Sequence, residues 1–199
     1  ISAGDYNNDG FPDILMTGDG PGVTKIYRNN GGITFTYQSD ISLPGVSNGS
    51  AKWGDYDNDG DPDIVIAGSG LIRIFSNNHD NTFTWLSEIE LPGIADSSIE
   101  WGDSDNDGDL DLLVTGWNTT RVYRNNGDNT FTEITGQPFH GVSWGSTSWG
   151  DYDNDGWIDI LLTGNGAARV YRNNHDNTYS YQSSIILADT WNSSGVWGD

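Results

Sequence analysis

The feature that most constrains this chain is an acidic loop that recurs with the pattern Asp-x-Asp/Asn-x-Asp-Gly-x-x-Asp. The loop begins at Asp5, Asp55, Asp103 and Asp151, so successive copies are separated by 50, 48 and 48 residues. A fixed spacing of this length is typical of one supersecondary unit per repeat, with the units stacked in series. The fold and the chemistry are therefore interpreted unit by unit.

Each loop places acidic side chains on alternate residues, and such a loop is stable only when a cation lies among the charges. Oxygen ligands at positions 1, 3, 5 and 9, with a backbone carbonyl at position 7, suit Ca2+. Mg2+ would keep more of its water, and Zn2+ would favour His or Cys. Glycine at position 6 permits the sharp turn. The pattern predicts about four Ca2+ ions, one in each loop.

Four strand-like segments are expected in each unit. The first carries Trp53, Trp101 or Trp149, with Ala3 in the first unit. The second is a continuous apolar run that we expect to be buried on both faces, at residues 14–16, 64–66, 112–114 and 160–162. The third includes residues 26–27, 74–75, 122–123 and 170–171, and an Asn-Asn pair then opens a turn. The fourth begins at Phe35, Phe83, Phe131 or Tyr179 and alternates apolar with polar residues.

Four antiparallel strands in each repeat predict an all-β fold, a β-propeller with four-stranded blades of about 48 residues. We expect a single propeller or propeller segment over residues 1–199. Its blades would lie at approximately 1–48, 49–97, 98–146 and 147–194, and the first strand of a further blade at 195–199. A chain of four blades would leave apolar blade faces exposed, so we expect a homo-oligomer or further blades of a longer chain.

Charge and composition exclude several classes of partner. The formal net charge is −21, and the acidic residues are concentrated in the loops. No basic stripe is available to bind the phosphates of nucleic acid or an anionic membrane surface. No run of 18 apolar residues is present, so membrane insertion is not expected. The absence of Cys does not fix the compartment, but a Ca2+ requirement favours an extracellular, secreted or cell-surface protein.

The motif Trp-Gly-Asp-Tyr-Asp-Asn-Asp-Gly-x-x-Asp, followed by Val-Tyr-Arg-Asn-Asn-Gly-Asp-Asn-Thr-Phe-Thr, resembles the integrin-type propeller repeat, known as the FG-GAP or VCBS-like repeat. The resemblance covers the whole chain. It implies that each acidic loop joins the first two strands of a blade and binds Ca2+. By position, the implied side-chain ligands are Asp5, Asn7, Asp9 and Asp13; Asp55, Asp57, Asp59 and Asp63; Asp103, Asp105, Asp107 and Asp111; and Asp151, Asp153, Asp155 and Asp159. The implied carbonyl ligands are those of Phe11, Asp61, Asp109 and Trp157.

The first loop has Asn7 where the other loops have Asp, so we expect it to bind Ca2+ more weakly. An EF-hand is the competing calcium motif, and it needs a bidentate Glu at position 12 and flanking helices. Position 12 is instead an apolar strand residue in every copy, namely Met16, Ile66, Val114 and Leu162. The EF-hand interpretation is therefore rejected.

The sequence suggests no catalytic group and no enzymatic activity. His79 and His175 occupy the same turn of two units, and His140 stands alone. The Trp residues of the first strands are expected to pack between blades. Trp117, Trp144 and Trp191 lie outside the repeat pattern, in connections that a four-stranded meander places at the end opposite the acidic loops. They indicate either a ligand face suited to stacking on sugar rings or partial burial under long loops. Trp157 is expected to cover its loop locally.

The predicted function is a non-enzymatic, extracellular, calcium-stabilised module for adhesion or for recognition of a glycan or protein ligand. Two alternatives remain open at this point. The chain could be a structural segment of a larger surface protein or assembly without its own ligand. It could also be an accessory domain of an enzyme.

Overall fold

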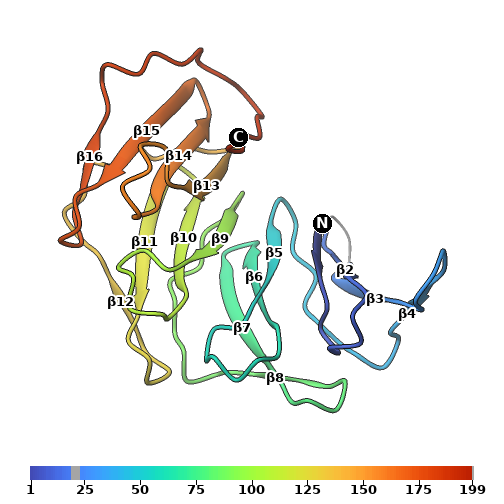
Figure 1. The fold of residues 1–199 in the computed structure, drawn as a ribbon. Helices are drawn as coiled ribbons and strands as arrows, with labels where there is room; N and C mark the ends of the chain where they lie inside the picture. The colour runs from blue at the N-terminus through green and yellow to red at the C-terminus, as the bar shows by residue number, and fades with distance from the viewer. Residues whose placement is uncertain (19–22, 199) are drawn as a thin grey trace. The chain divides into compact units, whose positions relative to one another are not determined.

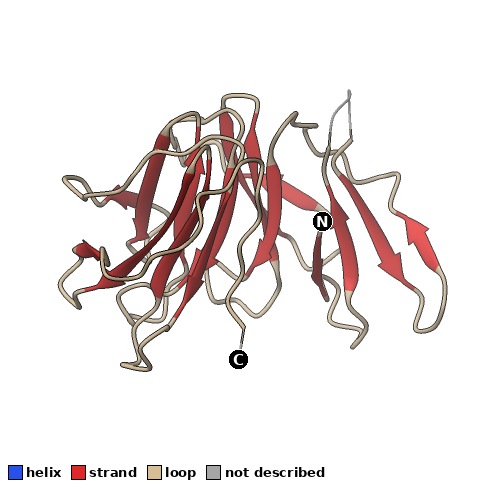
Figure 2. Cartoon of the chain, turned by 90° about the horizontal axis from the view of Figure 1, so that it is seen from above, coloured by secondary structure: helices blue, strands red, loops and turns tan. Residues whose placement is uncertain are grey.

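The computed structural model describes residues 1–18 and 23–198. These residues form sixteen β-strands and no helix (Figures 1 and 2). No helix long and apolar enough to cross a membrane occurs in this part of the chain. The chain divides into two compact units, Ile1–Ala95 and Asp96–Asp199, and the expectation of a single propeller over residues 1–199 stays a prediction. Each unit contains two of the four sheets.

The strands of unit 1 form a first and a second sheet. The first sheet contains β1 (Ser2–Gly4), β2 (Asp13–Met16), β3 (Lys25–Asn29) and β4 (Phe35–Tyr37). The second contains β5 (Ser50–Gly54), β6 (Asp63–Gly68), β7 (Leu71–Asn77) and β8 (Phe83–Trp85).

The strands of unit 2 form a third and a fourth sheet. The third sheet contains β9 (Ser98–Gly102), β10 (Asp111–Gly116), β11 (Thr119–Asn125) and β12 (Phe131–Glu133). The fourth contains β13 (Ser146–Gly150), β14 (Asp159–Gly164), β15 (Ala167–Asn173) and β16 (Tyr179–Tyr181).

Every sheet is an antiparallel meander in sequence order. In the second sheet, one row of paired residues crosses all four strands: Trp53 pairs with Ile64, Ile64 with Phe75, and Phe75 with Trp85. Because the strands alternate in direction, the acidic loop and the turn between the third and fourth strands lie at one end of each sheet. The turn between the second and third strands lies at the other end, with the connection to the next sheet. The predicted separation of the two ends is therefore confirmed within each sheet.

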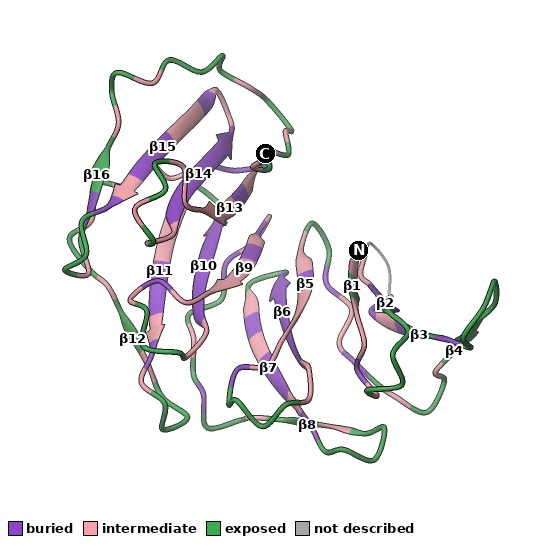
Figure 3. Cartoon of the chain, viewed as in Figure 1, coloured by how far each residue is buried: buried purple, intermediate pink, exposed green. Residues whose placement is uncertain are grey.

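The second strand of each sheet is its core. All residues of β6, β10 and β14 are buried, as the apolar runs predicted (Figure 3). β2 is shorter, and its burial alternates, so the expectation of burial on both faces is wrong for the first sheet. Within unit 1, the second sheet packs against only one face of the first. Burying one Val, Leu or Ile side chain contributes about 1.5–3 kcal/mol, so these strands are a major source of stability.

Within each unit, the Trp on the first strand of the later sheet packs against the preceding sheet, as expected for Trp53 and Trp149. The ring of Trp53 stacks on Tyr6 with centroids 5.7 Å apart and planes 5° apart. It also lies against Gly4, where an added Cβ would be only 2.8 Å from the Trp53 ring. In unit 2, Trp149 lies against Gly102 in the same way. Gly4, Gly102 and Gly150, which precede the first, third and fourth loops, therefore provide room for the next tryptophan ring.

The segment at residues 195–198 differs from the expected strand, because it forms no strand at all. Trp197 nevertheless takes the repeat position: its ring stacks on Tyr152 at 6.1 Å, and its Nε1 donates to the carbonyl of Ser148 at 3.3 Å. Asp199, which the repeat pattern places at the start of a further loop, lies outside the described residues.

Candidate functional site

The acidic loops share one backbone conformation, which depends on the first aspartate of each loop. In the second loop (55–63), the two carboxylate oxygens of Asp55 accept hydrogen bonds from the backbone N–H groups of Asp59 and Gly60, both at 3.0 Å. The same pair of bonds forms in the other three loops. Gly60 has a φ of 92°, a conformation that strongly favours glycine. The first carboxylate therefore holds the loop closed around itself.

The ninth residue of each loop is an aspartate buried at the start of the second strand. Asp63 is fully buried and accepts hydrogen bonds from the backbone N–H groups of Tyr56 at 3.0 Å and Asn77 at 2.8 Å. Burial raises the pKa of Asp63 to about 7 and the pKa values of Asp111 and Asp159 to about 6. A cation close to these carboxylates would favour their charged form.

Three of the loops bring carboxylates together in the way that a metal ion requires. Within each group the ligand atoms lie no more than 4.8 Å from one another, and the groups are Asp55, Asp57 and Asp63; Asp103, Asp105 and Asp107; and Asp151, Asp153 and Asp159. Ca2+ binds oxygen at about 2.3–2.6 Å, so two oxygens in one coordination shell lie at most about 5 Å apart. In addition, Oδ1 of Asp105 is buried without a hydrogen-bond partner, which is costly for an anionic oxygen. These residues fit a hard cation of that size.

The first loop (5–13) is built differently at its third position. Oδ1 of Asn7 accepts a hydrogen bond from the backbone N–H of Asp9 at 3.2 Å. Its Nδ2 is buried without a hydrogen-bond partner. An amide offers a single oxygen and no charge, and in the first loop that oxygen already accepts the N–H of Asp9. This arrangement is consistent with the weaker first site that the sequence predicts.

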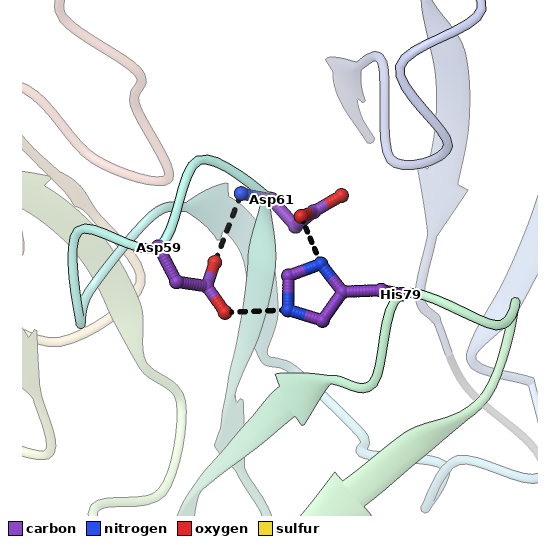
Figure 4. A group of neighbouring side chains, drawn as sticks. All are labelled: Asp59, Asp61 and His79. Carbon is purple, nitrogen blue, oxygen red and sulfur yellow. Dashed lines mark hydrogen bonds and ion pairs between the residues drawn. The ribbon is translucent and has the colours of Figure 1, made fainter.

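Cationic side chains from the strands behind the loops contact the fifth residue. Arg28 pairs with Asp9 at 3.0 Å, and Arg172 pairs with Asp155 at 2.7 Å. The hydrogen bond from Arg172 lowers the pKa of Asp155 to about 2. In the second loop, His79 replaces the arginine: its Nε2 lies 2.9 Å from Asp59, and its Nδ1 contacts Asp61 (Figure 4). The fifth carboxylates of the first, second and fourth loops thus have a cationic or imidazole partner within the protein, which no motif in the sequence indicates.

The seventh residue of each loop packs against the turn between the third and fourth strands. Trp157 stacks on His175 with centroids 4.7 Å apart, which confirms its role as a local cover. Phe11 lies over Gly31, and a carboxylate oxygen of Asp109 lies close to Gly127. The carbonyl groups of the seventh residues, predicted as ligands, stay a prediction.

The opposite end of unit 2 carries Trp117, Trp144 and Trp191, which we call the tryptophan face. Their exposed fractions are 71%, 54% and 69%, so the alternative of burial under loops is not supported. The segments that carry these tryptophans are joined by hydrogen bonds between neighbouring residues. The backbone N–H of Asn118 donates to Oγ of Ser143 at 2.9 Å, which joins the turn after Trp117 to the segment before Trp144.

A second set of contacts continues the tryptophan face to the fourth sheet. Nδ2 of Asn165 donates to Oδ1 of Asn118 at 3.3 Å. The ring of Trp191 lies over Gly166, where an added Cβ would be 3.4 Å from the ring. The three tryptophans therefore belong to one continuous surface that also carries amide and hydroxyl groups.

Two of these tryptophans have an unfavourable backbone conformation. Trp117 has a φ of 37° and Trp144 a φ of 50°, in the left-handed region that bulky residues rarely adopt. Residues at the equivalent position of the other repeats have nearly the same φ, but they are Asn48, Asp96 and Asn192, and Asn and Asp tolerate this region better. Sequence reasoning found the tryptophans because they break the repeat, but it could not see their strain.

The histidines agree with their interpretation as turn residues. His79 and His175 have φ values of 61° and 66° in equivalent turns. The backbone N–H of His140 donates to the hydroxyl of Tyr171 at 2.7 Å. Burial lowers the pKa of the His140 side chain, as does nearby Arg169.

Blade-like sheets that each carry an acidic loop between their first and second strands define a class, the β-propeller repeats with a cation-type loop. A family model described as FG-GAP-like repeat matches residues 5–66, 55–114, 103–162 and 151–199, and the chain belongs to this family. The predicted all-β fold of four-stranded propeller blades is thereby confirmed. No curated protein sequence matches the chain.

One similar solved structure is a lectin from Agrocybe aegerita, described as specifically recognising non-reducing terminal N-acetylglucosamine. The TM-score is 0.61 and the sequence identity is 21%. The match covers 95% of this chain and 52% of the lectin chain, so this chain spans about half the length of that protein. At this identity the likeness shows a shared fold.

Proposed function

We propose that the chain is a non-enzymatic, calcium-stabilised recognition module that works outside the cell and binds neutral glycans on its tryptophan face. The observation that carries the proposal is the exposure of Trp117, Trp144 and Trp191 on one continuous surface. An exposed indole ring in a strained turn contributes little to folding. Residues held in such conformations are concentrated at binding sites, where their strain is compensated by function.

The chemistry of the tryptophan face suits sugars. A flat indole ring can cover the apolar C–H face of a pyranose, while the amides of Asn118 and Asn165 can bond its hydroxyl groups. The net charge of −21 disfavours sialylated, sulfated or uronic glycans, because like charges repel. The lectin with the same fold recognises terminal N-acetylglucosamine, which makes glycans ending in that sugar the first probe.

Calcium is proposed for the acidic loops because their carboxylates converge at the spacing described above. Carboxylate and carbonyl oxygens are the ligands that Ca2+ prefers, and the predicted set contains neither a thiolate nor an imidazole. Millimolar Ca2+ outside cells would keep even weak sites occupied, since extracellular modules bind it with Kd values of about 10⁻⁴–10⁻³ M. This supports the proposed extracellular setting.

The test is a glycan array in Ca2+, followed by calorimetry on the best ligand. Trp117→Ala and Trp144→Ala should each weaken binding by about 2 kcal/mol, roughly thirtyfold in Kd, as expected for central aromatic contacts. The matched control is Trp85→Ala. Trp85 is also exposed, at 46%, but it lies on β8 of unit 1 with the Arg73 guanidinium over its ring.

Each outcome distinguishes the proposal from its alternatives. Glycan binding that survives both substitutions would place the ligand elsewhere on the molecule. A folded, Ca2+-loaded protein that binds nothing on the array would favour a structural segment without its own ligand.

A further inference from the structure

A buried asparagine connects neighbouring acidic loops within each unit. Asn77 ends β7 in unit 1, and Asn173 ends β15 in unit 2; their exposed fractions are 2% and 1%. In the sequence, each is the first residue of an Asn-Asn pair that opens a turn. Both residues are buried, and both make the same set of contacts in their own unit, which indicates a more specific role.

Asn77 contacts two loops at once. Its backbone N–H donates to Oδ1 of Asp63 at 2.8 Å, and its Nδ2 donates to the carbonyl of Pro62 at 3.1 Å, both in the second loop. The same Nδ2 donates to the carbonyl of Tyr6 in the first loop at 2.8 Å. That carbonyl belongs to the peptide group that leads into Asn7, so Asn77 fixes the backbone between two candidate ligands of the first loop.

Asn173 repeats this pattern in unit 2. Its backbone N–H donates to Oδ1 of Asp159 at 2.8 Å, and its Nδ2 donates to the carbonyl of Ile158 at 3.2 Å. Nδ2 also donates to the carbonyl of Ser104 at 2.8 Å, in the third loop. This carbonyl precedes Asp105, the residue whose Oδ1 is buried without a partner. A buried donor and acceptor that lose each other are costly, so the connection is strong.

A second connection runs in the opposite direction. Nδ2 of Asn8, at the fourth position of the first loop, donates to the carbonyl of Gly60 at 3.2 Å and to Oδ1 of Asp61 at 2.8 Å. In unit 2, Nδ2 of Asn106 donates to the carbonyl of Gly156 at 3.0 Å. Each pair of loops is therefore joined by a buried and an exposed hydrogen bond.

We infer that the two acidic loops of each unit bind Ca2+ cooperatively, with Asn77 and Asn8 coupling the first and second loops, and Asn173 and Asn106 coupling the third and fourth. The inference rests on the proposed Ca2+ binding. An ion that orders one loop also fixes the asparagines that hold its neighbour. The second loop then loses less conformational freedom when it binds, which raises its affinity. The four asparagines are positioning residues that act through the loop backbone.

The test uses two-dimensional NMR of the complete chain during a CaCl2 titration. The amide of Gly10 reports on the first loop and that of Gly60 on the second, because each donates to the first carboxylate of its loop. Asp57→Ala disables the second loop. If the two loops are coupled, the Asp57→Ala variant should need at least fivefold more Ca2+ than the unmodified chain to half-saturate the first loop, as measured at Gly10. Fivefold is the lower end of typical coupling factors.

Asn8→Gly should not disable either loop, but in its background Asp57→Ala should shift the Gly10 titration less. We call this shift at one loop, caused by a change in the other, the transmitted effect. Glycine tolerates the φ of 53° at this exposed position, so the variant should fold. The control is Asn78→Ala: Asn78 neighbours Asn77, but its amide nitrogen donates to Thr82 and its oxygen accepts from Thr84, both within the β7–β8 hairpin. This control should leave the transmitted effect intact.

Reciprocity provides a second route if Asp57→Ala unfolds the protein. Disabling the first loop with Asp9→Ala should shift the Gly60 titration in the same direction, because the coupling free energy between two binding equilibria is symmetric. The shift should be smaller, since the weaker first loop is only partly filled when the second is half saturated. The inference would be overturned if disabling either loop left the Ca2+ titration of the other loop unchanged. Glycine signals that do not respond to Ca2+ in the unmodified chain would instead overturn the proposed calcium sites.

Discussion

In the third sheet, the loop that joins β9 to β10 and the turn that joins β10 to β11 lie at opposite ends of the same strands. The loop has nearly the same residues as its counterparts and fixes them with backbone hydrogen bonds. The turn keeps the backbone conformation of its counterparts but changes the side chain: Trp117 stands where the other described turns have Ser69 and Asn165, all with positive φ.

This contrast separates two kinds of repetition. At the loop end, identical side chains are needed because they hold the loop together and converge on one point. At the tryptophan face, only the backbone is repeated, and the side chains are free to differ between units. Conserved chemistry at one end therefore supports the scaffold, and variable chemistry at the other end can serve recognition.

Removing Ca2+ should have the largest effect and should act through the loop end. A ligand that binds only the native state adds RT ln(1 + [L]/Kd), which in 5 mM Ca2+ is about 1–2.3 kcal/mol per site for the Kd range given above. For a domain of this size, each kcal/mol corresponds to roughly 2–4 °C in Tm. Thermal melts in 5 mM CaCl2 and in excess EGTA should therefore differ by ten degrees or more (an order-of-magnitude estimate).

The control for this measurement is MgCl2 at the same concentration, which should stabilise less because Mg2+ gives up its water reluctantly. Equal melting temperatures with and without Ca2+ would remove the proposed role of the loops and would leave the acidic groups as a solvated surface.

Asn7→Asp should have the next largest effect, by making the first loop resemble the other three. A carboxylate has a second oxygen available after one has accepted the N–H of Asp9, and it adds a negative charge. We expect Ca2+ affinity at the first loop to rise on the order of tenfold, since ligand charge tunes calcium affinity. Calorimetry would detect the change, and Asp105→Asn should produce the reverse change at the third loop. A weaker first site in Asn7→Asp would mean that position 3 does not face the ion.

Trp144→Asn should have the smallest effect on stability, and its direction is the opposite of a usual truncation. Asparagine tolerates a φ near 50° better than tryptophan, and the exposed ring loses little packing. We expect a gain of about 1 kcal/mol in the free energy of unfolding, together with loss of glycan binding. Denaturant unfolding in saturating Ca2+ would measure the gain. Asn192→Trp is the reverse control and should destabilise, whereas a destabilised Trp144→Asn would show that the ring contributes to folding.

The sequence predicted the fold well because the acidic loops and apolar runs recur with a fixed period. Three carboxylates of each predicted set converge in the second, third and fourth loops, but Asp59, Asp111 and Asp155 lie outside these groups. The sequence overestimated the burial of the first sheet, because β2 is less buried than its apolar run suggests. It also expected a strand at 195–198, where Trp197 keeps its packing position but the backbone does not form the sheet bonds.

Features that depend on neighbouring repeats could not be predicted from the sequence. The two-loop contacts of Asn77 need the distance between adjacent sheets, which no motif encodes. The strain at Trp117 and Trp144 is a property of dihedral angles. A signal for the asparagines was present, because the first residue of each Asn-Asn pair recurs in all four units beside a buried strand.

The seventh position of the acidic loop has an implication for how such repeats diverge. Its side chain packs against the opposing turn, and the combinations in this chain are Phe11 with Gly31, Asp61 with His79, Asp109 with Gly127, and Trp157 with His175. In the second and fourth loops, an exchange at either partner alone would leave a carboxylate without its counter-charge or a ring without its stacking surface. In the first and third loops, a side chain larger than glycine would collide with Phe11 or Asp109. The two positions should therefore change together during evolution, and a designer who transplants a loop from one unit to another should move its turn with it.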